Sequence, residues 1–226
     1  MRVAFYGGSF DPPHCWHLAI ARAAMERLRL DRVAFAPVGT QPLKRDMAAA
    51  SFGERLAMVR LAVADDVRLE VSQVDAPRAS GTPNYTVDTL AQFRKSLDPG
   101  DELFCLLGAD SFLTVKRWHR ATDLLMDCDF IVAGRPGFSL ENASRALPDG
   151  VSFAGVCAGQ AEYASRVMSD GAGRQRTLFL LPDLKIDISA TEIRGALAEG
   201  DVRQNVLPST VVDYIHAHGL YAQNQN

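Results

Sequence analysis

The chain has 226 residues and a mass of 24.6 kDa, which is long enough for a domain whose hydrophobic core needs no disulfide or metal support. Apolar residues make up 47% of it, charged residues 23%, and the formal net charge is −3, so the composition excludes a disordered chain, a collagen-like fibre and a generally basic nucleic-acid-binding protein. No apolar run reaches the length of about 18 to 20 residues that a membrane-spanning helix requires, and the first residues do not resemble a signal peptide. We therefore expect a cytoplasmic protein without nucleic-acid or membrane partners.

Short apolar runs alternate with segments of helical spacing along the chain. The expected strands cover residues 3–6, 32–37, 67–74, 102–107, 130–133 and 177–181. The expected helices cover residues 17–28, 52–64, 86–97, 190–198 and 209–218. This alternation predicts βαβ units, and hence an α/β fold with a Rossmann-like, doubly wound parallel sheet and a helical C-terminal portion.

Residues 1–222 are predicted to form a single domain, and the polar residues 223–226 a frayed tail. Between residues 137 and 176, small and charged residues mix around a weak helical pattern, which predicts a helical insertion or a loop-rich flap. The four cysteines contain no CxxC pair, so they predict reduced thiols and no metal or disulfide framework. Because open sheets of this class bind ligands beyond the carboxyl ends of their strands, functional residues are expected in the strand-to-helix turns.

The first strand runs directly into the turn GGSFDPPHCWH, which contains a pair of glycines and two histidines. Gly7 and Gly8 allow a ligand to approach the backbone closely, and the free N–H groups of the following helix start favour an anion. His14 and His17, three residues apart, place two rings on one side, where phosphate charge would favour imidazolium. The histidines could instead only cap the helix; a metal site would lack a third ligand. The turn matches neither GxxxxGK[ST] nor GxGxxG, which excludes a P-loop or a standard dinucleotide-binding domain.

A second such turn, ISATEIR, lies near the other end of the chain. Ser189 or Thr191 is the expected N-cap, and Arg194, one turn further on, can direct its guanidinium at the same anion. The alternative is an ordinary capped helix with a surface arginine. Two anion-binding turns in one α/β chain suggest a polyphosphate held between them.

These residues resemble the nucleotidyltransferase superfamily that is marked by HxGH and ISSTxxR-like signatures, and within it the bacterial nicotinate-nucleotide adenylyltransferases. Seven segments carry the resemblance, in the family's order along the chain: GGSFDPPH, QPLK, PNYTVDTL, LLGADSF, RWH, AGRPG and ISATEIR. The resemblance implies adenylyl transfer from ATP to nicotinate mononucleotide, giving deamido-NAD and pyrophosphate in NAD biosynthesis. It also implies Mg²⁺ bound through the ATP phosphates, with no metal ligands from the protein.

The resemblance assigns a role to each matching residue. Catalysis, by binding the phosphates, is implied for His14, His17, Lys44 and Arg194. ATP binding is implied for Gly7, Gly8, Ser9, Phe10, Asp110, Ser189 and Thr191, of which Asp110 would take the ribose hydroxyls. Binding of nicotinate mononucleotide is implied for Tyr85, Thr86, Trp118, His119 and Arg135.

Within that last group, Trp118 would stack on the pyridine ring, while Thr86 and the backbone around Tyr85 and His119 would meet the nicotinate carboxylate. Simpler roles are open for several of these residues. Trp118 could be a packing residue, Asp110 a helix N-cap, and Lys44 and Arg135 solvated surface cations.

One position departs from the family pattern, because Trp16 replaces the glycine between the two histidines. A bulky indole there must point elsewhere, reshape the adenine pocket or stack on the base. The alternatives are a sister adenylyltransferase that uses nicotinamide mononucleotide or phosphopantetheine, or a nucleotide-binding protein with impaired catalysis.

Overall fold

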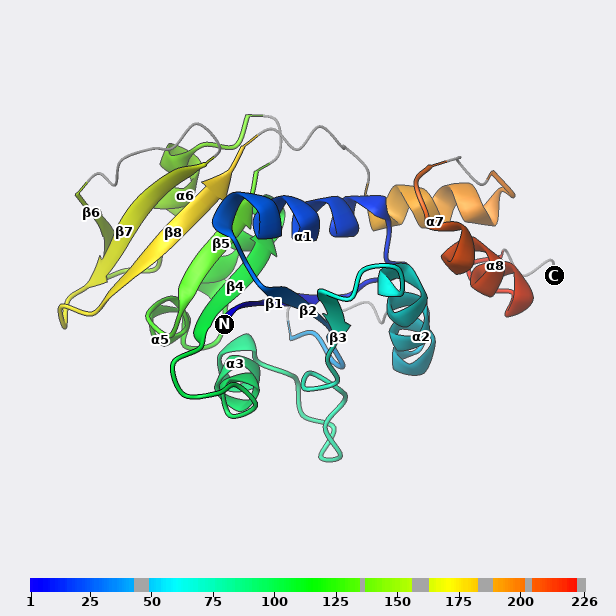
Figure 1. The fold of residues 1–226 in the computed structure, drawn as a ribbon, viewed down its shortest axis with the longest axis horizontal. Coiled ribbons are helices and arrows are strands. Elements are labelled where there is room, and N and C mark those ends of the chain that lie inside the picture. The colour runs from blue at the N-terminus through cyan, green and yellow to red at the C-terminus, as the bar shows by residue number, and fades with distance from the viewer. Residues whose placement is uncertain (43–48, 135–136, 156–162, 183–188, 202–204, 223–226) are drawn as a thin grey trace.

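The computed structural model describes residues 1–42, 49–134, 137–155, 163–182, 189–201 and 205–222, and one eight-stranded sheet runs through its centre (Figure 1). The strand order is β3–β2–β1–β4–β5–β8–β7–β6. The strands are β1 (Arg2–Gly8), β2 (Arg32–Pro37), β3 (Leu69–Val71), β4 (Glu102–Gly108), β5 (Asp129–Ala133), β6 (Val151–Ala154), β7 (Ala164–Asp170) and β8 (Gln175–Leu181). Neighbouring strands from β3 to β8 in this order pair in parallel. Strand β7 pairs antiparallel with β8 on one side and with β6 on the other. The predicted doubly wound α/β fold is therefore confirmed.

Helices cover both faces of the sheet. They are α1 (Cys15–Leu28), α2 (Phe52–Val63), α3 (Thr86–Arg94), α4 (Ala109–Phe112), the 3-10 helix η1 (Val115–Arg117), α5 (Ala121–Leu125), α6 (Leu140–Ala146), α7 (Ala190–Ala198) and α8 (Ser209–Ala217). Helices α1, α2, α7 and α8 pack into one core cluster, and α3, α4, η1, α5 and α6 pack into the other. Successive residues of β1 pack into opposite clusters: Ala4 and Tyr6 into the first, Val3 and Phe5 into the second. Because both faces of β1 are buried, the strand is apolar along its whole length and shows no alternation.

The region from residue 137 to 176 differs from the prediction of a helical insertion or loop-rich flap. Its described part contains one short helix, α6, followed by β6 and β7, which extend the sheet beyond β8 (Figure 1). Most side chains of β6 and β7 are only partly buried, and Met168 is the fully buried residue of β7. Because these two strands bury little apolar surface, their hydrophobic pattern is too weak to distinguish them from a loop. No helix in the described ranges is long and apolar enough to cross a membrane.

The order of the strands creates a switch point between β1 and β4. From β1 the sheet continues to β2 and β3 on one side, and from β4 it continues to β5 and β8 on the other. The carboxyl ends of β1 and β4 therefore lie side by side, and α1 and α4, which follow them, pack on opposite faces of the sheet. A crevice at such a point is where open α/β sheets bind ligands.

Candidate active site

The turn after β1 places a deeply buried ring beneath a pair of partly buried glycines. Phe10 has φ 48°, in the left-handed region, and its ring is 1% exposed, packing against Tyr6 and Phe35 with centroid distances of 5.5 and 5.4 Å. A Cβ atom on Gly8 would lie 3.1 Å from that ring, and one on Gly7 would lie 2.9 Å from the Phe5 ring. The two glycines thus leave room for rings beneath the turn. Phe10 can contribute only its backbone to a ligand.

The two histidines at the start of α1 form a stacked pair. Their ring centroids lie 3.7 Å apart, and the backbone N–H of His14, the N-cap, donates to His17 Nδ1 at 3.2 Å. Burial, and secondly the neighbouring His14, lower the pKa of His17 well below 6.5. Without a bound anion His17 is therefore neutral at physiological pH, and the imidazolium expected beside bound phosphates stays a prediction. Since Nδ1 accepts a hydrogen bond, the proton of this neutral ring is placed on Nε2, which makes Nε2–H a hydrogen-bond donor.

Trp16 points away from this pair and into the protein. Its side chain is 6% exposed and belongs to the core cluster that α1 shares with the C-terminal helices. The backbone N–H of the preceding Cys15 donates to Val206 O at 2.8 Å, so the start of α1 abuts the segment that leads into α8. Of the three options for this indole, pointing elsewhere is the one that the packing supports, and stacking on a base is not.

The turn before α7 has the predicted cap but a different hydrogen-bond pattern. Ser189 is the N-cap, and its Oγ accepts from the Glu192 backbone N–H at 3.2 Å. The Glu192 carboxylate in turn accepts from Ser189 N at 2.8 Å and from Ser189 Oγ at 2.9 Å. The hydroxyl of Ser189 is therefore committed to a capping box. Thr191 is exposed, with Oγ1 3.4 Å from Arg194 Nη2.

Arg194 connects the two predicted anion-binding turns. Its Nη1 donates to the backbone carbonyl of Asp11 at 2.8 Å and lies 3.9 Å from Asp11 Oδ2, although the two residues are 183 positions apart. The structure thus brings the α7 turn against the β1–α1 turn. This is the arrangement expected for two turns that hold one polyphosphate.

Asp11 is a hub that the sequence did not reveal. Its carboxylate is buried and accepts from the backbone N–H groups of Ala49 and Ala50 at 2.8 and 3.1 Å and from the Tyr221 hydroxyl at 2.7 Å. Burial and the adjacent carboxylate raise the pKa of Tyr221. One side chain thus ties the β1–α1 turn to the residues before α2 and to the C-terminal segment. Lys44, in the preceding QPLK segment, lies outside the described residues.

Arg55 supports the same turn from below and was also not predicted. It is 3% exposed, and its guanidinium donates to three backbone carbonyls: Ser9 at 2.7 Å, Val38 at 2.9 Å and Ala50 at 3.2 Å. Burial lowers the pKa of Arg55, and Asp11 opposes this effect. No local pattern distinguishes this arginine from the other arginines of the chain, whereas Asp11 lies within the GGSFDPPH segment.

At the end of β4, Gly108 is the N-cap of α4, and Asp110 is an exposed residue of its first turn. The alternative role of Asp110 as the helix N-cap is therefore wrong. Its place beside the switch point leaves the predicted contact with a ribose as an open prediction.

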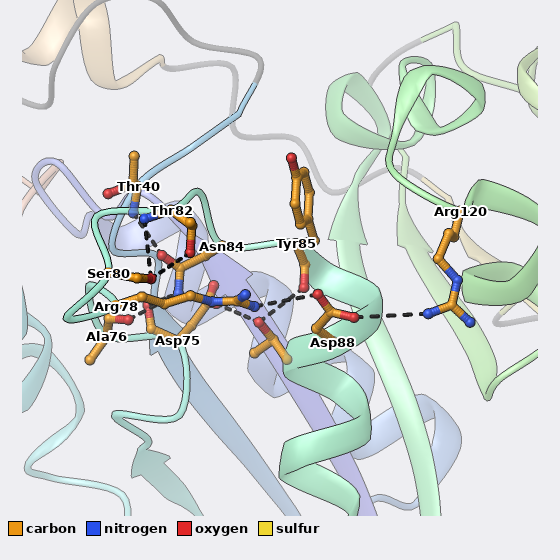
Figure 2. Close-up of polar contacts among 11 residues, drawn as sticks. Thr40, Asp75, Ala76, Arg78, Ser80, Thr82, Asn84, Tyr85, Asp88 and Arg120 are labelled. Atoms are coloured by element: carbon orange, nitrogen blue, oxygen red, sulfur yellow. Dashed lines mark hydrogen bonds and ion pairs between the residues drawn. The ribbon is translucent and has the colours of Figure 1, made fainter.

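Two of the residues predicted for the mononucleotide, Tyr85 at the start of α3 and His119 after η1, lie against each other, and Figure 2 shows Tyr85. Tyr85 is the N-cap of α3 and Thr86 its first residue, and the Tyr85 ring lies 4.2 Å from the His119 ring. Trp118 is partly buried, its indole N–H donates to Thr114 Oγ1 at 3.0 Å, and it lines an open hollow of about 610 Å³. Packing therefore explains part of the role of Trp118, and stacking on a ligand stays a prediction. Arg135 lies outside the described residues.

Comparisons with known proteins agree with this architecture. A family model described as cytidylyltransferase-like matches residues 5–196. A protein from Laribacter hongkongensis named "Probable nicotinate-nucleotide adenylyltransferase" is 41% identical over 225 residues, covering 97% of this chain and 94% of that protein. A protein of the same name from Solibacter usitatus is 35% identical, with 98% and 100% covered.

Among solved structures, the nicotinic acid mononucleotide adenylyltransferase of Plasmodium falciparum complexed with NaAD has a TM-score of 0.69 over 97% of both chains. Its sequence identity of 18% makes this a likeness of fold alone. The family model and the curated relatives carry the assignment further. This chain therefore belongs to the cytidylyltransferase-like family and, within it, to the nicotinate-nucleotide adenylyltransferases, which are nucleotidyltransferase enzymes.

Proposed function

We propose that this enzyme transfers the adenylyl group of ATP to nicotinate mononucleotide, giving deamido-NAD and pyrophosphate as a step of NAD biosynthesis in the cytoplasm. The observation that carries the proposal is the contact between Arg194 Nη1 and the Asp11 carbonyl at 2.8 Å, beside the stacked pair His14 and His17. It unites the two anion-binding turns into one site for a triphosphate. The names of the curated relatives support the same substrates.

The reaction needs no nucleophile from the protein. A phosphate oxygen of nicotinate mononucleotide attacks the α-phosphorus of ATP, and the bond from that phosphorus to the β-phosphate oxygen breaks as pyrophosphate leaves. The protein must hold the three groups in line and offset the repulsion between two polyanions. His17, neutral and with Nε2–H as a donor, and Arg194, as a fixed cation, supply complementary parts of this environment. We assign the same task to His14 and Lys44.

The remaining residues are assigned to the two substrates, one on each side of the switch point. On the ATP side, the backbone from Gly7 to Phe10 lines the nucleotide, and Asp110 accepts from the ribose hydroxyls. The Ser189 hydroxyl reaches the triphosphate only if its capping box opens, whereas Thr191 is already exposed. On the mononucleotide side we place Tyr85, Thr86, Trp118, His119 and Arg135.

Magnesium fits this site as a partner of the phosphates. Among the residues that the structure describes, no three His, Cys, Asp or Glu side chains gather closely enough to form a metal cage. The carboxylate of Asp11 is already occupied by three donors. We therefore propose that Mg²⁺ is held through ATP phosphate oxygens and water, as is usual for this ion, and that it neutralises phosphate charge when bound.

The decisive experiment measures pyrophosphate release from ATP by the purified enzyme with nicotinate mononucleotide, nicotinamide mononucleotide or phosphopantetheine as the acceptor. We expect nicotinate mononucleotide to give the highest kcat/KM. A higher kcat/KM with phosphopantetheine or with the amide would identify a sister adenylyltransferase. The absence of release with every acceptor, in a protein that still binds ATP, would identify a nucleotide-binding protein without this activity.

A further inference from the structure

We propose that Asn84 is a positioning residue that holds the first turn of α3 in place for the nicotinate carboxylate, and that it thereby sets the preference for the acid over the amide mononucleotide. The inference rests on the proposed function, because it concerns how that substrate is distinguished from its amide. It concerns the residue immediately before Tyr85 and Thr86, which are the proposed contacts of the carboxylate.

The side chain of Asn84 is buried between two loops, and both its amide oxygen and its amide nitrogen make hydrogen bonds. It is 5% exposed, its Oδ1 accepts from Thr40 N at 3.1 Å, and its Nδ2 donates to the carbonyls of Asp75 and Ala76 at 3.1 and 2.9 Å (Figure 2). Its backbone N–H also donates to Thr40 O at 3.0 Å. A buried amide with its hydrogen bonds made costs free energy to displace, since each group would be left without a partner.

The same two loops are also joined backbone to backbone. Gly39 N donates to Asp75 O at 2.7 Å, and a Cβ atom on Gly39 would lie 2.4 Å from Pro77 N. This close approach brings the exit of β2 against the loop that ends at Asn84. Through these hydrogen bonds Asn84 fixes the start of α3 relative to the end of β2 in the central sheet.

A second contact fixes α3 from its own first turn. The Thr89 hydroxyl donates to Asp75 Oδ1 at 2.6 Å and lies 3.2 Å from Tyr85 O, and Figure 2 shows Asp75 and Tyr85. Asp75 is 6% exposed, so this contact is shielded from water. Asn84 on one side and Thr89 on the other thus hold Tyr85 between them.

The charges around this turn favour an anionic ligand. Asp88, the acidic residue in the first turn of α3, pairs with Arg78 at 3.5 Å and with Arg120 at 3.9 Å (Figure 2). These arginines offset a charge that would otherwise repel a nicotinate carboxylate. The first N–H groups of a helix have no partner within the helix, so they can donate to a carboxylate, whereas the NH₂ group of an amide would meet them as a second donor. The orientation of these N–H groups therefore determines how much more tightly the acid mononucleotide binds than the amide.

The test compares kcat and KM for nicotinate mononucleotide, nicotinamide mononucleotide and ATP in Asn84→Ala and in the matched control Asn142→Ala. Asn142 also bonds to a neighbouring loop residue, Ser139, but at the start of α6. For Asn84→Ala we expect the ratio of kcat/KM for acid over amide to fall at least about tenfold, through a higher KM for the acid, while the KM for ATP changes less than about twofold. Asn142→Ala should keep the wild-type ratio.

A second pair of variants keeps the test decisive if Asn84→Ala does not fold. Thr89→Val removes the hydroxyl and keeps the shape, so it should lower the ratio, and Thr89→Ser should restore it. A folded Asn84→Ala or Thr89→Val enzyme with an unchanged ratio, or with equal rises of KM for ATP and the acid, would overturn the inference. A wild-type enzyme that does not use nicotinate mononucleotide would instead overturn the proposed function on which the inference rests.

Discussion

The hydroxyl of Tyr221 offers a precise test of the Asp11 hub. Tyr221→Phe removes one hydrogen bond of 2.7 Å to a buried carboxylate and leaves the donors from Ala49 and Ala50 in place. A hydrogen bond to a charged group contributes about 1.5–3 kcal/mol. Because two backbone donors remain, we expect a loss near the lower end, about 2 kcal/mol in the free energy of unfolding. For a chain of this size that corresponds to a fall in Tm of roughly 4–8 °C.

The assay is urea and thermal unfolding of Tyr221→Phe beside Tyr214→Phe, which removes a hydroxyl from α8. The pKa of Tyr221 is raised in the folded state, so above pH 10 the unfolded chain releases this proton first. The contribution of the hydroxyl is therefore fully present below pH 10 and declines as the pH rises above it. An unchanged Tm in Tyr221→Phe, or an equal fall in both variants, would refute the role of Asp11 as a hub.

Four further predictions follow from the site and its supports. His17→Ala should lower kcat at least about a hundredfold in a folded enzyme, measured as pyrophosphate release, since a preorganised donor to the transition state is lost; near-normal turnover would remove His17 from the site. Trp118→Ala should raise the KM for the mononucleotide far more than that for ATP, and equal rises would argue against ring stacking. Arg55→Met should cost about 3 kcal/mol or more in urea unfolding, because three buried carbonyls lose their donor, whereas Arg60→Met, on the exposed side of the same helix, should cost little. Burial raises the pKa of Asp75 from 3.8 to about 6, so its contribution to stability falls as the pH rises from 4 to 7; Asp75→Asn should remove up to about 3 kcal/mol of that pH dependence, and an identical pH profile would contradict it.

The sequence by itself determined the fold class and most of the central elements. The strand at residues 32–37 and the helix at residues 190–198 begin and end where predicted. A strand that is buried on both faces is a short, continuous apolar run, and the start of helix α7 is marked by its N-cap Ser189. Both elements can therefore be predicted from a few neighbouring residues. The sequence did not indicate the short helices α4, α5 and α6 or the strands β6 and β7, because these elements bury too few side chains to produce a hydrophobic period.

The motifs could be predicted in the same way, but the positions of their side chains could not. GGSFDPPH and ISATEIR predicted two anion-binding turns, yet nothing local indicated that the Phe10 ring lies beneath the turn, that Trp16 enters the core or that His17 is neutral. Burial and pKa depend on which elements pack against a side chain. Those elements come from distant parts of the chain.

Only the tertiary structure decided what supports the site. Asp11 meets Arg194 across 183 positions and Tyr221 across 210, and Asn84 meets Thr40 across 44. Local patterns report the face that a residue presents within its own element, because helical and strand periods extend over only a few residues. Hydrogen bonds between loops depend instead on how the whole sheet brings its carboxyl ends together, and that position is set by the packing of all the strands and helices at once.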